Sequence, residues 1–225
     1  MAEVFDSQYY EVVARQSAAE RLLIAARDRI FHDFMSEMQP GPADRVLDVG
    51  VSDVVNDGAN VLERSFPYQH NITACGLGNG TTFTSAYPAV KYVRIEANAR
   101  LPFADASFDI ATSNAVLEHV GSPAHQEFFV RELSRIAKRV FITVPNRYFP
   151  VEHHTALPLV HYSDNLFRIA CDLFEKSEWT EPANLILMSR RRLRDLARPL
   201  GRPADVGYTG LRLGPFSSNL YLAFR

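Results

Sequence analysis

The feature that most constrains the fold is a strand-like segment that runs directly into a turn with a carboxylate and a glycine. Residues 45–49 read Arg-Val-Leu-Asp-Val, and Gly50 follows. A glycine lets the backbone turn sharply and lets a ligand approach it closely. In α/β proteins, such a junction lies at the carboxyl edge of a parallel sheet, where nucleotide-like ligands bind. The junction therefore predicts an α/β fold with a ligand site beside Asp48 and Gly50.

Segments with strand and helix character alternate along the rest of the chain. Ser17 and Glu20 form a capping box, so a helix is expected from residue 18 until shortly before Pro40. Serines before apolar periodic segments mark further helix starts. The expected strands cover residues 45–49, 71–75, 90–95, 108–113, 140–144, 206–213 and 218–224, and further helices cover 59–66, the segment after 123, 164–174 and 190–197. This alternation predicts a mostly parallel sheet with helices on both faces.

Bulk composition places the chain among soluble globular proteins. Its 225 residues, 47% hydrophobic and 22% charged, suit a single domain over residues 1–225. The net charge of −2 argues against nucleic acid as a partner, because such binding usually needs a basic excess. Cys75 and Cys171 form no C-x-x-C pair, so we expect reduced thiols and no structural zinc. With no secretory signal or bilayer-length apolar run in view, we expect a cytoplasmic protein without a membrane span.

Three segments between residues 46 and 120 carry a family resemblance. The sequence VLDVG at residues 46–50 is similar to the first motif of class I S-adenosylmethionine-dependent methyltransferases. The sequence LPFADASFD at residues 101–109 resembles the LPF-x-D-x-SFD segment of their type-11 branch, and SNAVLEHV at residues 113–120 is similar to the next segment of that branch. The resemblance implies a Rossmann-like, seven-stranded, mostly parallel sheet with an antiparallel last strand. It also implies S-adenosylmethionine as cofactor and methyl transfer as the reaction.

The resemblance also suggests which residues contact S-adenosylmethionine. The backbone beside Gly50 would approach the amino-acid part, and Asp48 would help to hold its ammonium group. Gly76 would lie against the ribose and adenine, and Asn114 beside the methionine moiety. Without a cofactor, Asp48 would cap a loop, and Gly76 and Asn114 would be turn residues. The expected cofactor-binding residues are Asp48, Gly50, Ser52, Asp53, Gly76, Leu77, Glu96, Asn98, Asn114 and Ala115.

Two departures from the family pattern favour an alternative function. Residues 51–53 are Val-Ser-Asp, where the family has a run of glycines, and Gly76 stands where it has an acid that binds the ribose hydroxyls. Losing that charge-assisted pair costs about 1.5–3 kcal/mol unless another residue replaces it. Asp53, Asn79 or Asn98 are candidates, and an acid introduced at Gly76 would tighten binding if the space is free. The alternative is a non-catalytic binding or scaffold protein with a degenerate cofactor site.

Histidines supply the candidate catalytic groups. Methyl transfer to oxygen or nitrogen needs alignment and removal of a proton, and a histidine titrates near neutral pH. His119, His153 and His154 are therefore candidate catalytic residues, although any one of them alone is more simply a hydrogen-bonded structural residue. We expect no metal, because His153 and His154 are adjacent and point apart and no histidine pair has i, i+4 spacing.

The remaining expectations concern the parts around the sheet. Residues 1–39, including Tyr9 and Tyr10, are expected to form a helical lid over the cofactor, and residues 145–185 an insertion that binds the acceptor. The expected acceptor is a small molecule or biosynthetic intermediate. A nicotinamide-dependent oxidoreductase is disfavoured, because the first turn lacks G-x-G-x-x-G. The sequence does not indicate whether oxygen, nitrogen or carbon is methylated, nor the oligomeric state.

Overall fold

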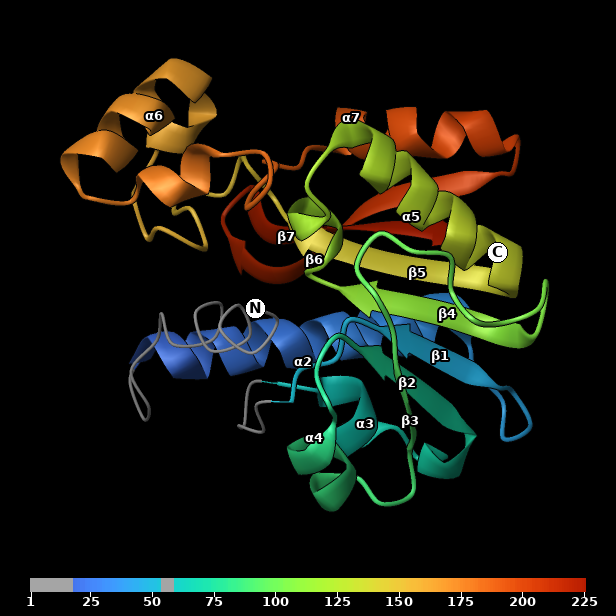
Figure 1. Ribbon diagram of the computed structural model, residues 1–225. Coiled ribbons are helices and arrows are strands. Elements are labelled where there is room, and N and C mark those ends of the chain that lie inside the picture. Colours follow the sequence, from blue (N-terminus) through green and yellow to red (C-terminus); the bar gives the residue numbers. More distant parts are fainter. Residues whose placement is uncertain (1–17, 54–58) are drawn as a thin grey trace.

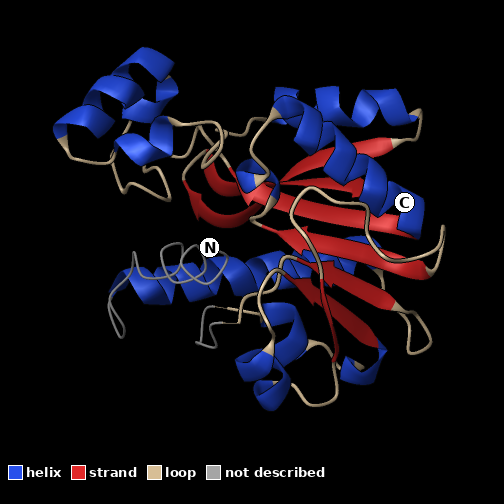
Figure 2. Ribbon diagram, in the orientation of Figure 1, coloured by secondary structure: helices blue, strands red, loops and turns tan. Residues whose placement is uncertain are grey.

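The computed structural model describes residues 18–53 and 59–225, which are built around one twisted sheet (Figures 1 and 2). The sheet has seven strands in the order β3-β2-β1-β4-β5-β7-β6. The pairs among β1 to β5 are parallel, and β7 runs antiparallel to both β5 and β6. The strands are β1 (Val46–Val49), β2 (Ile72–Gly76), β3 (Lys91–Arg94), β4 (Phe108–Asn114), β5 (Ala137–Pro145), β6 (Ala204–Leu213) and β7 (Phe216–Phe224). The predicted fold class is confirmed.

Helices cover both faces of this sheet, as the alternating pattern predicts. The helices are α2 (Ala18–Met38), α3 (Val61–Ser65), α4 (Thr81–Ala86), α5 (Pro123–Ile136), α6 (Asp164–Leu173) and α7 (Arg190–Ala197). On one face, α2, α3 and α4 bury Phe34, Phe66 and Phe83 in a single core. On the other face, α5 and α7 bury Leu133 and Leu193. Strands β1, β2, β4 and β5 are therefore mostly buried, which explains their apolar runs in the sequence, whereas the edge strand β3 is partly exposed.

The helix starts inside the described residues follow the expected capping chemistry. The Ser122 hydroxyl accepts a hydrogen bond from the His125 N–H at the start of α5, and Ser189 does the same for Arg192 at the start of α7. The capping residue expected at Ser17 lies outside the described residues. Helix α4 was not predicted from the sequence, because six residues rich in threonine and serine carry no helical periodicity.

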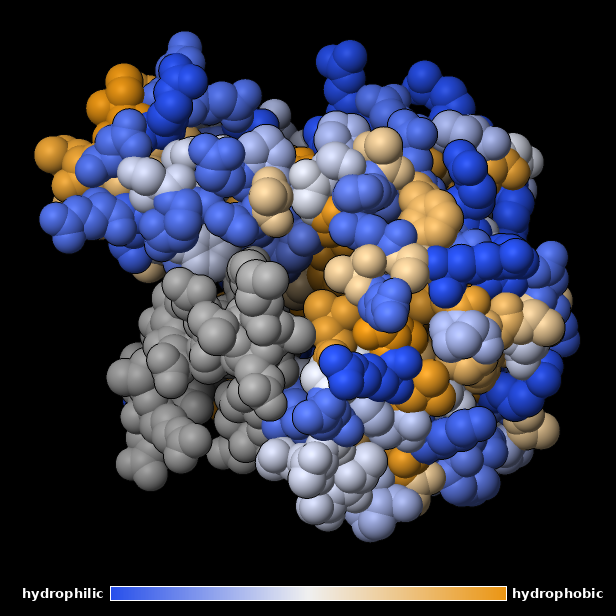
Figure 3. All heavy atoms as spheres, in the orientation of Figure 1, coloured by the Kyte–Doolittle hydropathy of each residue, from blue (hydrophilic) through white to orange (hydrophobic). Residues whose placement is uncertain are grey.

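The segment between β5 and α7 leaves the sheet and forms a lobe of its own, visible beyond the sheet edge in Figure 1. Its small core contains Phe167, Cys171, Trp179 and Leu185. The outer surface of α6 exposes Leu166, Ile169 and Leu173, seen as hydrophobic colour at the far end of the lobe in Figure 3. Among the described residues, no helix has both the length and the apolar character that a membrane crossing requires.

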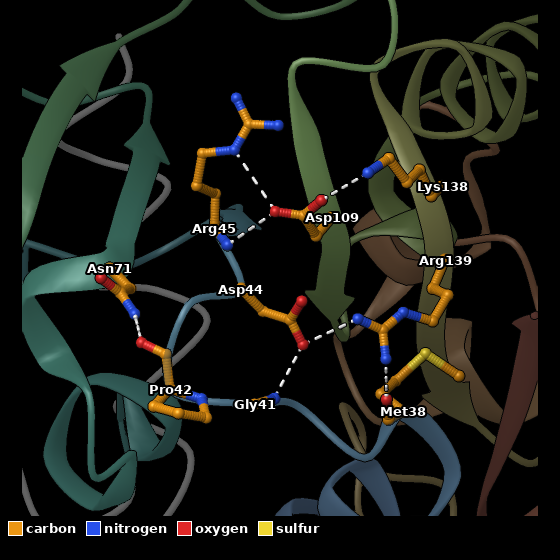
Figure 4. A network of polar contacts seen from close by, with 9 residues as sticks. All are labelled: Met38, Gly41, Pro42, Asp44, Arg45, Asn71, Asp109, Lys138 and Arg139. Atoms are coloured by element: carbon orange, nitrogen blue, oxygen red, sulfur yellow. Dashed lines mark hydrogen bonds and ion pairs between the residues drawn. The ribbon is translucent and has the colours of Figure 1, made fainter.

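Polar side chains tie the amino-terminal ends of the central strands together (Figure 4). The Asp109 carboxylate in β4 accepts hydrogen bonds from the Arg45 backbone N–H at 3.0 Å and from Lys138 Nζ at 2.8 Å. The Asp44 carboxylate accepts from Arg139 at 2.8 Å. The pKa of Asp109 is held well below its usual range by Lys138 first and by Arg45. This network fixes the starts of β1, β4 and β5 and leaves their opposite ends open for a site.

We predict that Asp109→Asn lowers the free energy of unfolding by about 1–2 kcal/mol at pH 7, because it removes charge-assisted hydrogen bonds. A lowered folded-state pKa stabilises the protein above the unfolded value of about 3.9, and this stabilisation is lost as the pH falls through the folded value. Urea denaturation at a series of pH values measures both effects. The exposed Asp195→Asn on α7 is the control and should change stability far less. Equal stability of Asp109→Asn and wild type at pH 7 would contradict this assignment.

Candidate functional site

A cleft opens at the carboxyl edge of the sheet, where β1 and β4 lie side by side. The chain turns from the end of β1 toward β2 and from the end of β4 toward β5, so the loops diverge there. The cleft holds roughly 610 Å³ of empty space, part of it open to solvent. Helix α2 closes one side with Arg27, Ile30, Phe31 and Phe34, and the strand ends contribute Asp48, Gly50, Asn114 and Thr143. Three of the expected cofactor-binding residues, Asp48, Gly50 and Asn114, are therefore brought together.

An acidic pair lies beside this cleft, which Asp48 lines and Glu63 does not. Burial raises the pKa of Asp48 to about 7. Glu63 from α3 is fully buried beside it, and its pKa is raised by burial and by the charge of Asp48. Two buried carboxylates this close do not both ionise at low cost, but a cationic group between them would let both carry charge. Without a cation the two acids keep protons and share a hydrogen bond, and a ligand ammonium beside Asp48 would let it ionise. Glu63 was missed from the sequence, because a glutamate in a short helical segment has the usual signature of a surface residue.

The turn after β1 explains why position 50 is a glycine. Gly50 has a φ of +103°, and a Cβ there would lie 2.2 Å from Cγ2 of Val116. The Gly50 N–H donates to the Cys75 carbonyl at 2.8 Å. The neighbouring Ser52 is buried, and its backbone exchanges two hydrogen bonds with the Asn60 side chain. A larger residue at position 50 would therefore collide with protein, whether or not a cofactor is bound.

The loop after β4 presents Asn114 and Ala115 at the same edge. The Asn114 side-chain oxygen accepts a hydrogen bond from the Thr143 hydroxyl, and Asn114 is only partly buried. Ala115 has a φ of +55°, and its N–H donates to the Thr143 carbonyl at 3.0 Å. Thr143 in β5 thus fixes the position of both residues beside the cleft. Their expected contact with the methionine moiety remains a prediction.

Tyrosine fills the space where the family carries its ribose-binding acid. A Cβ on Gly76 would lie 2.7 Å from Oη of Tyr92 and 2.9 Å from the Val51 carbonyl oxygen. The Tyr92 hydroxyl donates to the Gly78 carbonyl at 2.8 Å, which holds the ring in place. The space is therefore not free, and the expectation that an acid at Gly76 would tighten binding is wrong.

The other residues expected near the adenosine follow the ends of β1, β2 and β3. Asp53, named as a substitute for the missing acid, accepts a hydrogen bond from the Phe83 N–H at 2.8 Å through its Oδ1. That bond supports the start of α4. Leu77, Glu96 and Asn98 are exposed beyond the ends of β2 and β3. Their contact with a cofactor stays a prediction.

We predict that Gly76→Ala destabilises the fold by about 1–3 kcal/mol, because the added methyl group overlaps the Val51 carbonyl and the Tyr92 ring. Thermal unfolding measures the effect. Gly41→Ala is the matched control, since a Cβ there meets only Asp44 Oδ2, at an ordinary 3.7 Å. Wild-type stability of Gly76→Ala would show that Tyr92 moves aside freely, and the position would then be open to an acidic side chain.

A cluster of histidine and glutamate side chains lies where the lobe meets the sheet. His119 belongs to the turn Leu117–His119 after β4, and His154 comes from the lobe. Their Nε2 atoms are 3.1 Å apart. The Glu152 carboxylate lies 2.8 Å from His154 Nδ1, and the Asn184 carbonyl lies 2.6 Å from His119 Nδ1. His153 instead packs against the Phe149 ring, with 5.8 Å between ring centroids. Of the expected catalytic histidines, the structure brings His119 and His154 together and leaves His153 apart.

Burial and mutual charge perturb every group in this cluster. Burial raises the pKa of Glu152, but the His154 hydrogen bond and charge outweigh it and lower the value to about 2. Burial lowers the pKa of His154, and the Glu152 carboxylate outweighs it and raises the value. Burial and the His154 charge lower the pKa to about 3 in His119 and to about 4 in His153. Burial raises the pKa of Glu118 to about 7. These shifts favour a charged His154 beside an ionised Glu152, whereas His119 and His153 are neutral at neutral pH and weakly basic.

Comparisons of the sequence and of the structure with known proteins both find methyltransferases. Residues 68–140 match the family model described as a methyltransferase domain. No curated protein matches. A methyltransferase from Aquifex aeolicus has a similar structure, with a TM-score of 0.59, 14% identity and 98% of each chain covered. So has a possible histamine N-methyltransferase from Thermotoga maritima, with a TM-score of 0.58, 16% identity and coverage of 100% of this chain and 99% of the other. The methyltransferase domain of bacterial CtHen1 gives a TM-score of 0.58 at 13% identity, covering 90% of this chain and 98% of that one.

The strand order and the cleft at the β1–β4 junction define a protein of the class I methyltransferase fold. The family match agrees with the predicted resemblance and covers two of its three segments, residues 101–109 and 113–120. S-adenosylmethionine-dependent methyltransferases are therefore the proteins that this chain resembles, both in this family match and in fold. The match spans residues 68–140, which include β2 to β4 and helix α5.

Proposed function

We propose that the enzyme methylates a small-molecule acceptor held between the cleft and the lobe of residues 146–188. The observation that carries this proposal is the adjacency of two polar sites at one sheet edge. Asn114 lines the cleft, and Glu118 and His119 follow it within five residues. The methyl group of a cofactor seated beside Asn114 would then be close to the histidine cluster.

A second, smaller cavity supports this position for the acceptor. It is lined by side chains of the lobe and by Glu118, and its polar lining includes Asn146, Arg147, Glu152 and His153. Buried polar groups of this kind are costly unless they are paired or meet a polar ligand. The net charge of −2 favours a small acceptor over a nucleic acid. Residues 145–185 are thus proposed as the acceptor-binding insertion, and α2 as the described part of the lid.

The non-catalytic alternative keeps one observation in its favour. Tyr92 occupies the place of the ribose-binding acid, and Asp53 already supports α4. A scaffold protein would not need an acid at position 76 or a free Asp53 to bind the ribose. The acidic pair of Asp48 and Glu63 favours the enzyme, because a buried pair of acids without a cationic ligand is costly. Binding of the methyl donor separates the two functions.

We predict that S-adenosylmethionine and S-adenosylhomocysteine bind in calorimetric titration and that NAD does not. Asp48→Asn should weaken binding of both by roughly tenfold or more, because a charge-assisted contact with the ligand ammonium is lost. The exposed Asp172→Asn on α6 serves as the control and should bind like wild type. Absence of binding to wild type would favour the scaffold protein, and equal binding by Asp48→Asn would place the ammonium elsewhere.

A further inference from the structure

We propose that Glu118, His119 and His154 form a binding site for a divalent transition-metal ion, for which zinc is the natural probe. One ligand atom from each residue lies within 4.8 Å of the other two. The sequence argued against a metal, because neighbouring histidines point apart and no helical histidine pair exists. The structure instead brings His154 of the lobe next to Glu118 and His119 in the turn after β4. These residues are far apart in the sequence, so no local motif indicates the cluster.

Hydrogen bonds at the far side of each ring determine which nitrogen faces the centre of the cluster. A carbonyl oxygen only accepts, so His119 Nδ1 carries the hydrogen that meets the Asn184 carbonyl at 2.6 Å. The Glu152 carboxylate oxygen lies 2.8 Å from His154 Nδ1, so this nitrogen also carries a hydrogen. In the neutral form of each ring, the lone pair is then on Nε2. Both Nε2 atoms therefore face the same point with the tautomer that metal ligation requires.

The distance between these nitrogens matches a shared ion. Two nitrogens about 2.0–2.1 Å from a zinc ion in tetrahedral geometry lie about 3.3 Å apart. The observed separation is 3.1 Å. Glu118 Oε1 lies 3.9 Å from His119 Nε2, and all three ligand atoms lie within 4.8 Å of one another, so the carboxylate has to move closer to the rings to complete three ligands.

The carboxylate of Glu118 is the independent sign that a cation belongs here. Its side chain is 1% exposed. Neither of its oxygens accepts a hydrogen bond from any group in residues 18–53 and 59–225. A buried carboxylate without a donor is costly, and a bound cation would compensate it directly.

A hydrogen bond between the two rings explains only part of this arrangement. It uses a proton on His154 Nε2, which a bound cation would displace, and it leaves both Glu118 oxygens without a donor in the described chain. A single cation instead accepts both Nε2 lone pairs and a Glu118 oxygen together. The cation therefore accounts for all three side chains with no further group.

The groups behind the ligands form the support that metal sites require. A carboxylate or backbone carbonyl usually holds the second nitrogen of a ligating histidine. Glu152 plays this role for His154, and the Asn184 carbonyl plays it for His119. Glu152 is itself fixed by hydrogen bonds from the Thr155 backbone N–H at 2.6 Å and the Thr155 hydroxyl at 2.8 Å.

The ligand set indicates both the kind of ion and its use. Two imidazoles and one carboxylate suit zinc and other first-row transition ions better than magnesium or calcium. Three protein ligands leave a coordination position open, as in catalytic zinc sites. An acceptor oxygen bound there would have a lowered pKa, and that role rests on the proposed methyl transfer. The ion site itself does not depend on it.

The chain offers a built-in reporter for the test. Trp179 is the single tryptophan of the sequence, and its ring centroid lies 5.0 Å from that of His154. We propose to titrate chelator-treated, dialysed protein with ZnCl₂ and CoCl₂, without methyl donor. The readouts are calorimetry, tryptophan fluorescence and cobalt absorption. We expect one ion per chain, a change in fluorescence, and a rise in Tm on zinc binding.

Matched variants assign the ion to its ligands. Glu118→Gln and His154→Ala should each weaken zinc affinity at least about tenfold, and Glu152→Gln by about 10–100-fold. Glu127→Gln on α5 and His70→Ala are exposed controls that should bind zinc like wild type. Both buried cysteines remain in every variant. Circular dichroism checks the fold, and the nearly isosteric Glu118→Gln keeps the test valid if His154→Ala unfolds. Wild type without zinc binding, or Glu118→Gln with wild-type affinity, would overturn the proposal whatever the outcome with S-adenosylmethionine.

Discussion

The divergence of the chain at the ends of β1 and β4 is the constraint on which the rest of the structure depends. Right-handed crossovers send the loop after β1 to one side of the sheet and the loop after β4 to the other. The space between them becomes the cleft, and α2 lies across it. The polar network of Asp44 and Asp109 fastens the opposite ends of the same strands. The amino-terminal ends of these strands are thus held by polar contacts, and the cleft lies at their carboxyl-terminal ends.

Two buried acidic sites share the open edge, and we propose that each of them binds a cationic group. Asp48, which lines the cleft, forms one with the buried Glu63 and is the proposed contact of the methyl donor's ammonium. Glu118 forms the other, beside His119 and His154. The segment from Asn114 to His119 connects the two sites, so the methyl donor and the methyl acceptor would lie at opposite ends of one short loop. A buried charge is costly when it is alone, and a ligand of opposite charge offsets this cost, so such a site selects cationic ligands.

The sequence predicted the fold well because its signals are local. Apolar runs mark the central strands, and Ser122 and Ser189 cap their helices as expected. The site was only partly predictable. Asp48, Gly50 and Asn114 are together because parallel strands end at a common edge. Tyr92 over Gly76, Glu63 beside Asp48, and His154 against His119 each join segments far apart in the chain, and no local pattern encodes such contacts.

The central claim is that the methyl donor binds at the junction of β1 and β4. A crystal structure of the protein soaked with S-adenosylhomocysteine tests it most directly. The account predicts the homocysteine part between Asp48 and Asn114, with its ammonium near Glu63, and a ribose held without an acid at Gly76. Ligand density at another part of the molecule, or an empty cleft at saturating ligand, would contradict it.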